Sequence, residues 1–260
     1  MKIKTAVKQK FRSGQPVTMA FLCSKDANLA ELMALCGVDI VILDNEHFTF
    51  SEADISGILR ALSPYETACM LRTTSTDAGF LSRLMELGIN GIMAQQVKSA
   101  EHVRKIIDAV KYYPEGSRGF GMSRALSFGA EPLDPAAYMK AANDNFLLIP
   151  VVEDEEGASH AAEIAAIPGV DSVNVGAMDL SLSMGYGSKR TPEVMAVVQA
   201  TQKAIKEAGS ICADFVTAPE QVPELIKNGS KLLLLGTEQS MIVNFLQPIL
   251  RALKDAAGSC

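Results

Sequence analysis

The sequence predicts an α/β protein, a TIM (β/α)8 barrel formed by a single domain that spans residues 1–260. Eight short apolar runs alternate with longer segments of helical periodicity, and a chain of 260 residues has the usual length for eight strand–helix units. The runs are apolar at nearly every position, which is typical of parallel strands buried on both faces. An open doubly wound sheet is the alternative, but the chain lacks the glycine-rich first turn that usually accompanies that fold.

The predicted strands recur along the whole chain. They span residues 17–23, 39–44, 67–72, 90–95, 146–153, 171–176, 211–216 and 231–236. The segments between them carry helix-end signals. "DAGFLSRLMELG" (77–88) closes on a glycine, the residue that most readily adopts the left-handed conformation after a helix. "TPEVMAVVQATQKAIKEAG" (191–209) begins with a threonine cap followed by proline, and it also ends on glycine.

Two segments interrupt this alternation. Residues 114–133 form a long glycine-rich stretch before a short predicted helix at 135–144, and long loops in compact domains are usually functional or mobile. Residues 238–258, "EQSMIVNFLQPILRALKDAAG", predict a long helix with an apolar face. This helix either packs on the barrel or reaches a neighbouring subunit.

Composition argues against several classes of partner. The net charge is −6, so the protein has no electrostatic reason to bind nucleic acid or an anionic membrane surface. The amino-terminal stretch has cations but no apolar core typical of a secretory signal, and no apolar run approaches the ~20 residues that cross a bilayer. Five cysteines without a CxxC pair indicate reduced thiols. We therefore expect a cytoplasmic protein without nucleic-acid or membrane partners.

Polar side chains follow several of the predicted strands. Active sites of such barrels lie at the carboxyl ends of the strands, so these residues are candidates for catalysis. They are Asp44, Asn45, Glu46, His47, Arg72, Gln95, Gln96, Glu153, Asp154, Asp179 and Asp214. No lysine stands at any of these positions, which disfavours a Schiff-base mechanism.

Four of these residues suggest one kind of chemistry. Glu153 and Asp179 follow neighbouring strands, ~5 Å apart in a sheet, and paired carboxylates suit Mg²⁺ or Mn²⁺. His47 is a candidate general base, and Arg72 offers a fork for a carboxylate or an enolate oxygen. Together they predict enolisation of a 2-oxo acid. Structural explanations stay open, because a lone acid is often a helix cap and Arg72 could simply pair with Glu46.

Short motifs in the same order resemble the HpcH/HpaI family of class II pyruvate aldolases. They are "LDNEH" (43–47), "LR" (71–72), "YPEGSRG" (113–119), "VVE" (151–153) and "GAMDLSLSMG" (176–185), and the resemblance extends from about residue 10 to 255. It implies a TIM barrel that cleaves a 4-hydroxy-2-oxo acid reversibly to pyruvate and an aldehyde. It also implies a hexamer built as a trimer of dimers, with the last helix exchanged between subunits.

The resemblance also implies roles for individual residues. His47 would act as base and acid, Arg72 would hold the enolate oxygen, and Glu86 would orient the histidine. Glu153 and Asp179 would bind Mg²⁺, Mn²⁺ or Co²⁺. The substrate would contact Arg72, Asp179, Phe21 and the turn formed by Gly176, Ala177 and Met178.

Several residues differ from the usual family pattern, and they change the pocket wall rather than the metal, base and arginine positions. Asn45 replaces a glycine, Val151 a glutamine, Gln95 and Ala177 prolines, Phe21 a tryptophan, and Glu86 an aspartate. Three other functions therefore stay open. They are oxaloacetate decarboxylation, a CoA-ester lyase of the citrate-lyase-beta type, and binding of a 2-oxo acid without catalysis. An extra basic site for a CoA phosphate is not evident in the sequence.

Overall fold

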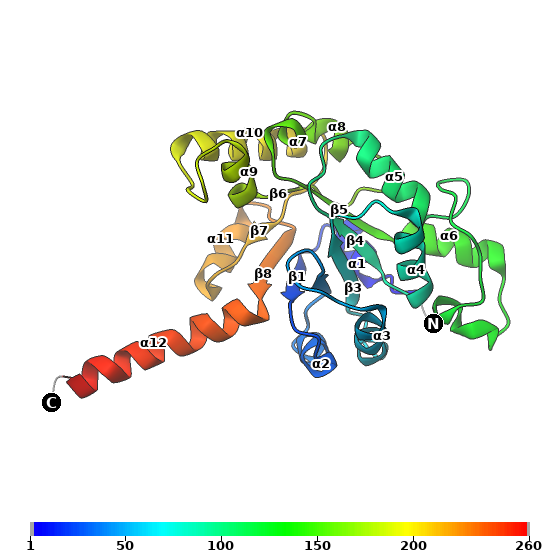
Figure 1. The fold of residues 1–260 in the computed structure, drawn as a ribbon, viewed down its shortest axis with the longest axis horizontal. Helices are drawn as coiled ribbons and strands as arrows, with labels where there is room; N and C mark the ends of the chain where they lie inside the picture. The colour runs from blue at the N-terminus through cyan, green and yellow to red at the C-terminus, as the bar shows by residue number, and fades with distance from the viewer. Residues whose placement is uncertain (1–2, 259–260) are drawn as a thin grey trace.

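The computed structural model describes residues 3–258, in which eight parallel strands form a curled central sheet surrounded by helices (Figure 1). The strands are β1 (Val17–Leu22), β2 (Ile40–Asp44), β3 (Ala68–Thr73), β4 (Gly91–Ala94), β5 (Leu147–Val152), β6 (Asn174–Val175), β7 (Asp214–Phe215) and β8 (Leu232–Thr237). They are ordered β6-β5-β4-β3-β2-β1-β8-β7. The prediction of eight parallel strands arranged as a barrel is confirmed, and six of them lie within one residue of their predicted bounds.

The predicted lengths of the other two strands were wrong. β6 and β7 each contain two residues, and the sheet has no ladder between them. The seam is instead bridged by one backbone hydrogen bond, from Val173 N–H to Ile211 C=O at 3.0 Å. Side chains complete it, because Asn174 Oδ1 accepts from Ala213 N–H at 3.0 Å and Ser172 Oγ donates to Ile211 C=O at 2.8 Å. Side-chain amides and hydroxyls have therefore replaced part of a strand ladder.

Most helices lie outside the strands, and the two helices whose end signals were described above have those signals. They are α1 (Ala6–Ser13), α2 (Ala27–Leu35), α3 (Glu52–Ala61), α4 (Ala78–Leu87), α5 (Ala100–Val110), α6 (Pro135–Asn145), α7 (Glu155–Ser159), α8 (Ala161–Ala165), α9 (Ala177–Ser183), α10 (Pro192–Glu207), α11 (Val222–Lys227) and α12 (Glu238–Gly258), with short 3-10 helices at Arg124–Gly129 and Pro219–Gln221. Gly88 ends α4 with φ 94°, and Thr191 Oγ1 caps α10, as predicted.

Alternation along the strands separates two layers of apolar side chains. The side chains inside the barrel include those of Met19, Ile40, Ile42, Met70, Met93, Ile149, Val151 and Leu234. The intervening residues, such as Val41, Leu71 and Ile92, pack beneath the outer helices. Helix α1 covers the amino end of the strands, where Val7 and Phe11 contact the inner layer. The same alternation continues to the carboxyl ends of the strands, where the inward-pointing residues are polar. We call this end the mouth of the barrel.

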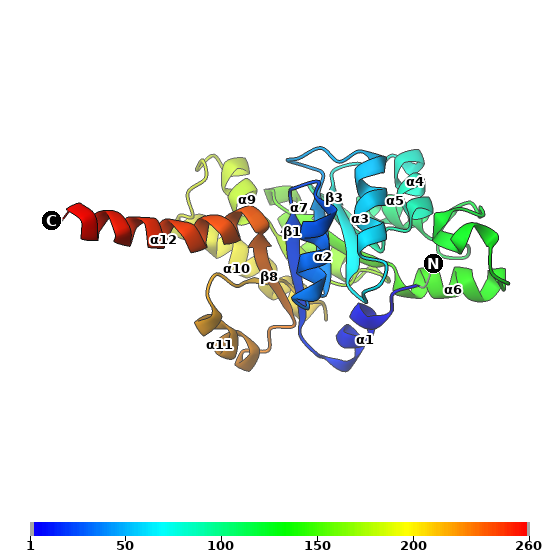
Figure 2. The same cartoon turned by 90° about the horizontal axis from the view of Figure 1, so that it is seen from below.

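Helix α12 extends away from the barrel (Figures 1 and 2). Eight of its apolar side chains are exposed: Met241, Ile242, Val243, Phe245, Leu246, Ile249, Leu250 and Leu253. An apolar face of this size marks an interaction surface. Within residues 3–258 no helix, α12 included, has both the length and the apolar character of a membrane span.

Candidate active site

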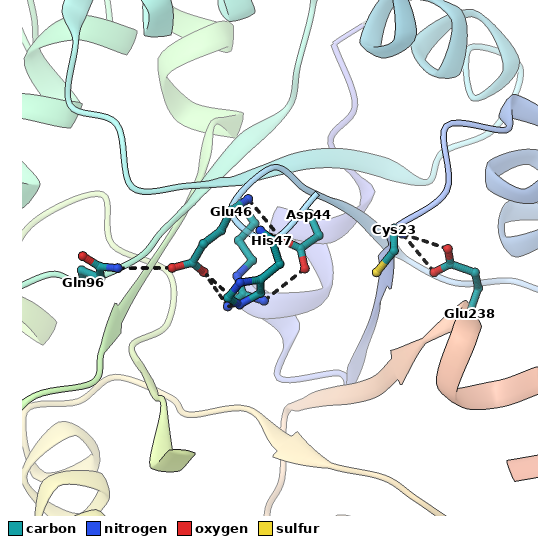
Figure 3. A network of polar contacts seen from close by, with 7 residues as sticks. Cys23, Asp44, Glu46, His47, Gln96 and Glu238 are labelled. Atoms are coloured by element: carbon teal, nitrogen blue, oxygen red, sulfur yellow. Dashed lines mark hydrogen bonds and ion pairs between the residues drawn. The ribbon is translucent and has the colours of Figure 1, made fainter. Parts of the chain in front are cut away.

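The turn after β2 presents Glu46 and His47 at the mouth. Asp44, the last residue of β2, accepts hydrogen bonds from the backbone N–H groups of Glu46 and His47, each at 3.2 Å (Figure 3). Asn45 stabilises the same turn, because its Oδ1 accepts from Phe50 N–H at 2.8 Å. The side chain of Asp44 is buried, whereas that of His47 is 57% exposed. The acid that ends the strand therefore holds the turn, and the imidazole is left accessible to a substrate.

Arg72 connects this turn to β3. Its Nη1 lies 3.3 Å from Asp44 Oδ2, and its Nη2 lies 2.5 Å from Glu46 Oε2 and 3.0 Å from His47 Nε2. The guanidinium also lies 5.2 Å from the centre of the Phe21 ring, which is a cation–π distance. Its Nε is buried without a hydrogen-bond partner. The pairing of Arg72 with Glu46 is thus observed, and it leaves one donor of the guanidinium for another group.

The contact between Arg72 and His47 determines which ring nitrogen is unprotonated. A guanidinium nitrogen only donates, so the hydrogen bond at 3.0 Å requires Nε2 of His47 to accept. The tautomer that fits this contact has its proton on Nδ1. The nitrogen that faces the arginine is therefore the one that can take up a proton during a reaction.

Glu153 follows β5, and its side chain is confined on two sides. Its Oε1 accepts from Gln96 N–H at 2.7 Å, and Gln96 has a positive φ of 54° that is unusual for a residue other than glycine. On the other side, a Cβ at Gly176 would lie 2.8 Å from Glu153 Cβ, which cannot move away as the end of a side chain can, so only glycine fits there. The strained backbone of Gln96 and the missing side chain at Gly176 together fix the carboxylate at the mouth.

Burial raises the pKa of Glu153 to about 7. The hydrogen bond from Gln96 N–H and the charge of Arg72 lower this pKa, whereas the neighbouring carboxylates of Glu46 and Asp179 raise it. The mouth therefore contains more negative charge than its one guanidinium offsets. A bound divalent cation would relieve this repulsion and favour the ionised form of Glu153.

The predicted metal ligands therefore fit a divalent cation by their charge and chemistry. Asp179 stands in the first turn of α9 and is close enough to Glu153 to raise its pKa. Residues 3–258 contain no group of three His, Cys, Asp or Glu side chains positioned to hold a metal ion. Two carboxylates nevertheless suffice for Mg²⁺, which usually keeps several water or substrate ligands. The metal site stays a prediction that the donor set supports.

The predicted substrate-binding turn also lies at the mouth. Gly176 precedes α9, and its N–H donates to Val152 C=O at 2.9 Å, beside Glu153. Ala177, Met178 and Asp179 form the first turn of the helix, where backbone N–H groups lack intrahelical acceptors. The side chain of Met178 is 54% exposed. The turn therefore presents backbone donors next to the proposed metal ligands.

The structure does not bring Glu86 to this cluster within the chain. Helix α4 runs back toward the amino ends of the strands, so Glu86 in its last turn lies far from the mouth. Its carboxylate accepts from Arg118 at 3.0 Å, and that guanidinium lies 4.5 Å from the centre of the Tyr112 ring. The arginine of the "YPEGSRG" segment therefore contacts the acid that was predicted to orient His47.

Sequence reasoning did not predict how Gln96 and Glu238 organise the mouth. Gln96 contributes through its backbone, a role that no side-chain pattern reveals. Glu238 begins α12, and its buried carboxylate accepts from the N–H groups of Cys23 and Ser24 at 2.7 to 3.0 Å (Figure 3). Burial, together with Glu238, raises the pKa of Cys23 to about 12, which agrees with the prediction that the cysteines are unreactive.

The fold and the mouth together define a barrel enzyme in which an exposed histidine, a guanidinium and buried acidic side chains lie at the carboxyl ends of the strands. A family model described as HpcH/HpaI aldolase/citrate lyase matches residues 17–244. The chain belongs to this family, as its motifs predicted. It is an enzyme, a carbon–carbon lyase of the aldolase type.

Named relatives support this assignment. The hydroxypyruvate/pyruvate aldolase of Delftia acidovorans is 32% identical over 216 residues, which cover 82% of this chain and 79% of the relative. The protein of the same name from Pseudomonas aeruginosa is 31% identical, with coverages of 96% and 93%. A crystal structure of an HpcH/HpaI aldolase from Desulfitobacterium hafniense shares the fold, with a TM-score of 0.86, 24% identity, and coverages of 95% and 96%.

Proposed function

We propose that the enzyme cleaves a 4-hydroxy-2-oxo acid reversibly to an aldehyde and a 2-oxo acid, either pyruvate or its 3-hydroxy derivative, with Mg²⁺, Mn²⁺ or Co²⁺ bound. The names of the two hydroxypyruvate/pyruvate aldolases support this choice of 2-oxo acid. The observation that carries the proposal is the 3.0 Å contact between His47 Nε2 and Arg72. It supports the proposal because a group that can accept a proton and a group that can donate to an oxyanion lie side by side, as one small substrate requires.

A reaction sequence follows from these positions. When bound at Glu153 and Asp179, a divalent cation supplies Lewis-acid polarisation of the 2-oxo group. His47 Nε2 takes the proton from the 4-hydroxyl, the C3–C4 bond breaks, and the aldehyde leaves. The electron pair of that bond passes to the 2-oxo acid fragment as an enolate, whose oxygen accepts a hydrogen bond from Arg72. The proton that His47 has taken up is then passed to C3, which gives the 2-oxo acid product and returns the imidazole to its starting state.

The substrate carboxylate has its own candidate site. The first-turn N–H groups of α9, at Ala177 and Met178, lie beside Glu153 and have no acceptor within the helix. The positive end of the helix dipole favours a carboxylate there. This placement leaves the 2-oxo group between Glu153 and Arg72.

Release of pyruvate from 4-hydroxy-2-oxo acids tests the proposed reaction. Pyruvate is measured by coupling to lactate dehydrogenase. We expect pyruvate release in the presence of Mg²⁺ or Mn²⁺, and we expect EDTA to abolish it. Restoration by excess cation is the control for damage by the chelator. Pyruvate release that EDTA leaves unchanged would contradict the proposed role of the cation.

The pKa of Glu153 predicts how the stability of the cation-free protein depends on pH. Because this pKa is raised from 4.5 to about 7 in the folded protein, the folded state binds the proton more tightly than the unfolded chain. The stabilisation is therefore present below pH 4.5 and is lost as the pH rises through about 7. Urea unfolding in EDTA between pH 5 and 8 should show the free energy of unfolding falling more steeply for the wild type than for Glu153→Gln. Parallel curves would contradict the raised pKa.

We propose further that the enzyme is a homo-oligomer, a hexamer built as a trimer of dimers, in which α12 packs against another copy. The exposed apolar face of α12 supports this arrangement. A cytoplasmic location is also proposed, and the unpaired state of Cys23, Cys36, Cys69 and Cys212 supports it.

Charged residues on α12 should dissociate the oligomer. The double substitution Phe245→Glu and Leu253→Glu places two charges on side chains that are 69% and 63% exposed in the single chain. Light scattering should then report a mass close to that of one chain, 27.8 kDa. Gln247→Glu adds a charge to the same helix at an exposed polar residue, and it should leave the mass of the wild type unchanged. An unaltered mass for the double variant would argue against assembly through α12.

A further inference from the structure

Gln95 projects into the mouth from the end of β4. Its N–H donates to Thr73 C=O at 2.9 Å, which extends the pairing of β4 with β3 by one residue before Gln96 ends it. Met93 belongs to the inner layer of the barrel, whereas Ala94 belongs to the outer layer. Because side chains alternate along an extended strand, that of Gln95 points inward, one step above Met93.

The amide of Gln95 lacks a partner in this position. The residue is 2% exposed, and its Nε2 has no hydrogen-bond partner. Pairing of Ala94 with Pro150 places Val151 as the next inward neighbour on β5, and an apolar side chain cannot accept a hydrogen bond. On β3, Arg72 pairs with Met93, one step below Gln95, and its guanidinium only donates, while Thr74, the next residue after the paired Thr73, makes no hydrogen bond with Gln95 Nε2.

Two buried donors without partners therefore lie on adjacent strands near their carboxyl ends. Both Gln95 Nε2 and Arg72 Nε lack acceptors, although buried polar groups in proteins are nearly always hydrogen-bonded. Such a pair is expected where a ligand supplies the oxygens. In the proposed reaction, Arg72 and the cation take the 2-oxo oxygen, and the first turn of α9 takes the carboxylate. The donor of Gln95 is left for an oxygen that pyruvate does not have.

We propose that Gln95 determines specificity for the 2-oxo acid, and that its Nε2 donates to a hydroxyl group on C3 of a 3-hydroxy-2-oxo acid. This inference rests on the proposed function and names the substrate class that its site prefers. Gln95 is neutral and can receive a hydrogen bond through Oε1 as well as donate through Nε2, so it suits a hydroxyl better than a carboxylate. Discrimination of this kind is strong, because a substrate without the hydroxyl leaves the buried donor unpaired.

Exchange of the C3 hydrogens with D₂O tests the proposal without an aldehyde. Proton NMR in the presence of Mg²⁺ follows the loss of one C3 proton and the gain of one deuteron, for pyruvate and for 3-hydroxypyruvate separately. Gln95→Met keeps the length of the side chain and removes the donor. We expect the ratio of the exchange efficiency of 3-hydroxypyruvate to that of pyruvate to fall by ~10-fold, the loss of about one hydrogen bond. Met93→Leu, one layer deeper on β4, is the packing control and should leave this ratio unchanged.

Stability of the substrate-free protein is the second measurement. Because Gln95→Met removes an unpaired buried donor, its midpoint of urea unfolding should equal or exceed that of the wild type. A lowered midpoint with equal losses for both acids would show a structural role and overturn the proposal. If Gln95→Met and Met93→Leu both exchanged the two acids with the wild-type ratio of efficiencies, this inference would be overturned and the proposed function would stand. Wild-type protein that exchanges neither acid would overturn both.

Discussion

Replacing His47 with alanine should lower the rate of aldol cleavage by about a thousandfold, the usual contribution of a positioned general base. The same substitution should affect decarboxylation of oxaloacetate much less, because loss of CO₂ forms the same enolate without removal of a hydroxyl proton. Pyruvate formation from the two substrates, measured with the same cation at saturating concentration, compares the two losses directly.

The histidine experiment has a matched control in His102→Ala. His102 lies on the outer helix α5, away from the cluster around Arg72, and its replacement should leave both activities at the wild-type level. If His47→Ala reduced cleavage and decarboxylation equally, the imidazole would not act as the base of the aldol step. The contact of His47 with Arg72 would then be expected to orient the guanidinium toward the enolate oxygen instead.

Glu153→Gln should abolish both activities rather than one. The substitution keeps the size of the side chain and an oxygen that can accept from Gln96 N–H, but it removes the charge that a cation requires. We expect the affinity for Mn²⁺ to fall by at least about 100-fold, beyond the loss typical of altering a residue that only supports a metal ligand. Titration followed by electron paramagnetic resonance measures this affinity without turnover.

The control for Glu153 is the next residue in the chain. Asp154 caps α7 through Gly157 N–H at 2.7 Å and lies 3.1 Å from Lys98 Nζ. Asp154→Asn should therefore leave the affinity for Mn²⁺ close to that of the wild type, because the side chain of Asp154 is already engaged by α7 and by Lys98. Unchanged Mn²⁺ affinity in Glu153→Gln would place the cation elsewhere and contradict the proposed site.

The inner strands and the rim of the barrel were predictable because local patterns determine them. Apolar runs define the strands, and the rule that the active site lies at their carboxyl ends places His47, Arg72 and Glu153 at one mouth. β6 and β7 were predicted too long because Asn174 and Ser172 replace ladder hydrogen bonds with side-chain hydrogen bonds to Ala213 and Ile211. Such substitutions leave the apolar pattern of a strand intact, so the pattern could not reveal them.

Contacts between distant segments were less predictable. The pairing of Glu86 with Arg118 joins residues far apart in sequence, and no periodicity indicates it. The differences from the family pattern at Gln95 and Val151 are also separated in sequence, yet the register of β4 and β5 makes them neighbours. Gln95 and Val151 therefore belong to the same wall of the pocket. Only the three-dimensional structure shows that these two differences from the family pattern lie side by side.

The first residue of α12 links the arm of the molecule to its catalytic end. Glu238 accepts hydrogen bonds from the N–H groups of Cys23 and Ser24, which follow β1. Reorientation of α12 would therefore strain the end of β1, where the Phe21 ring lies against Arg72. If the subunits associate through α12 as proposed, this one carboxylate would connect their association to turnover. Dilution to separated chains would then impair catalysis as well as assembly, even if no neighbouring copy contributed an atom to the reaction.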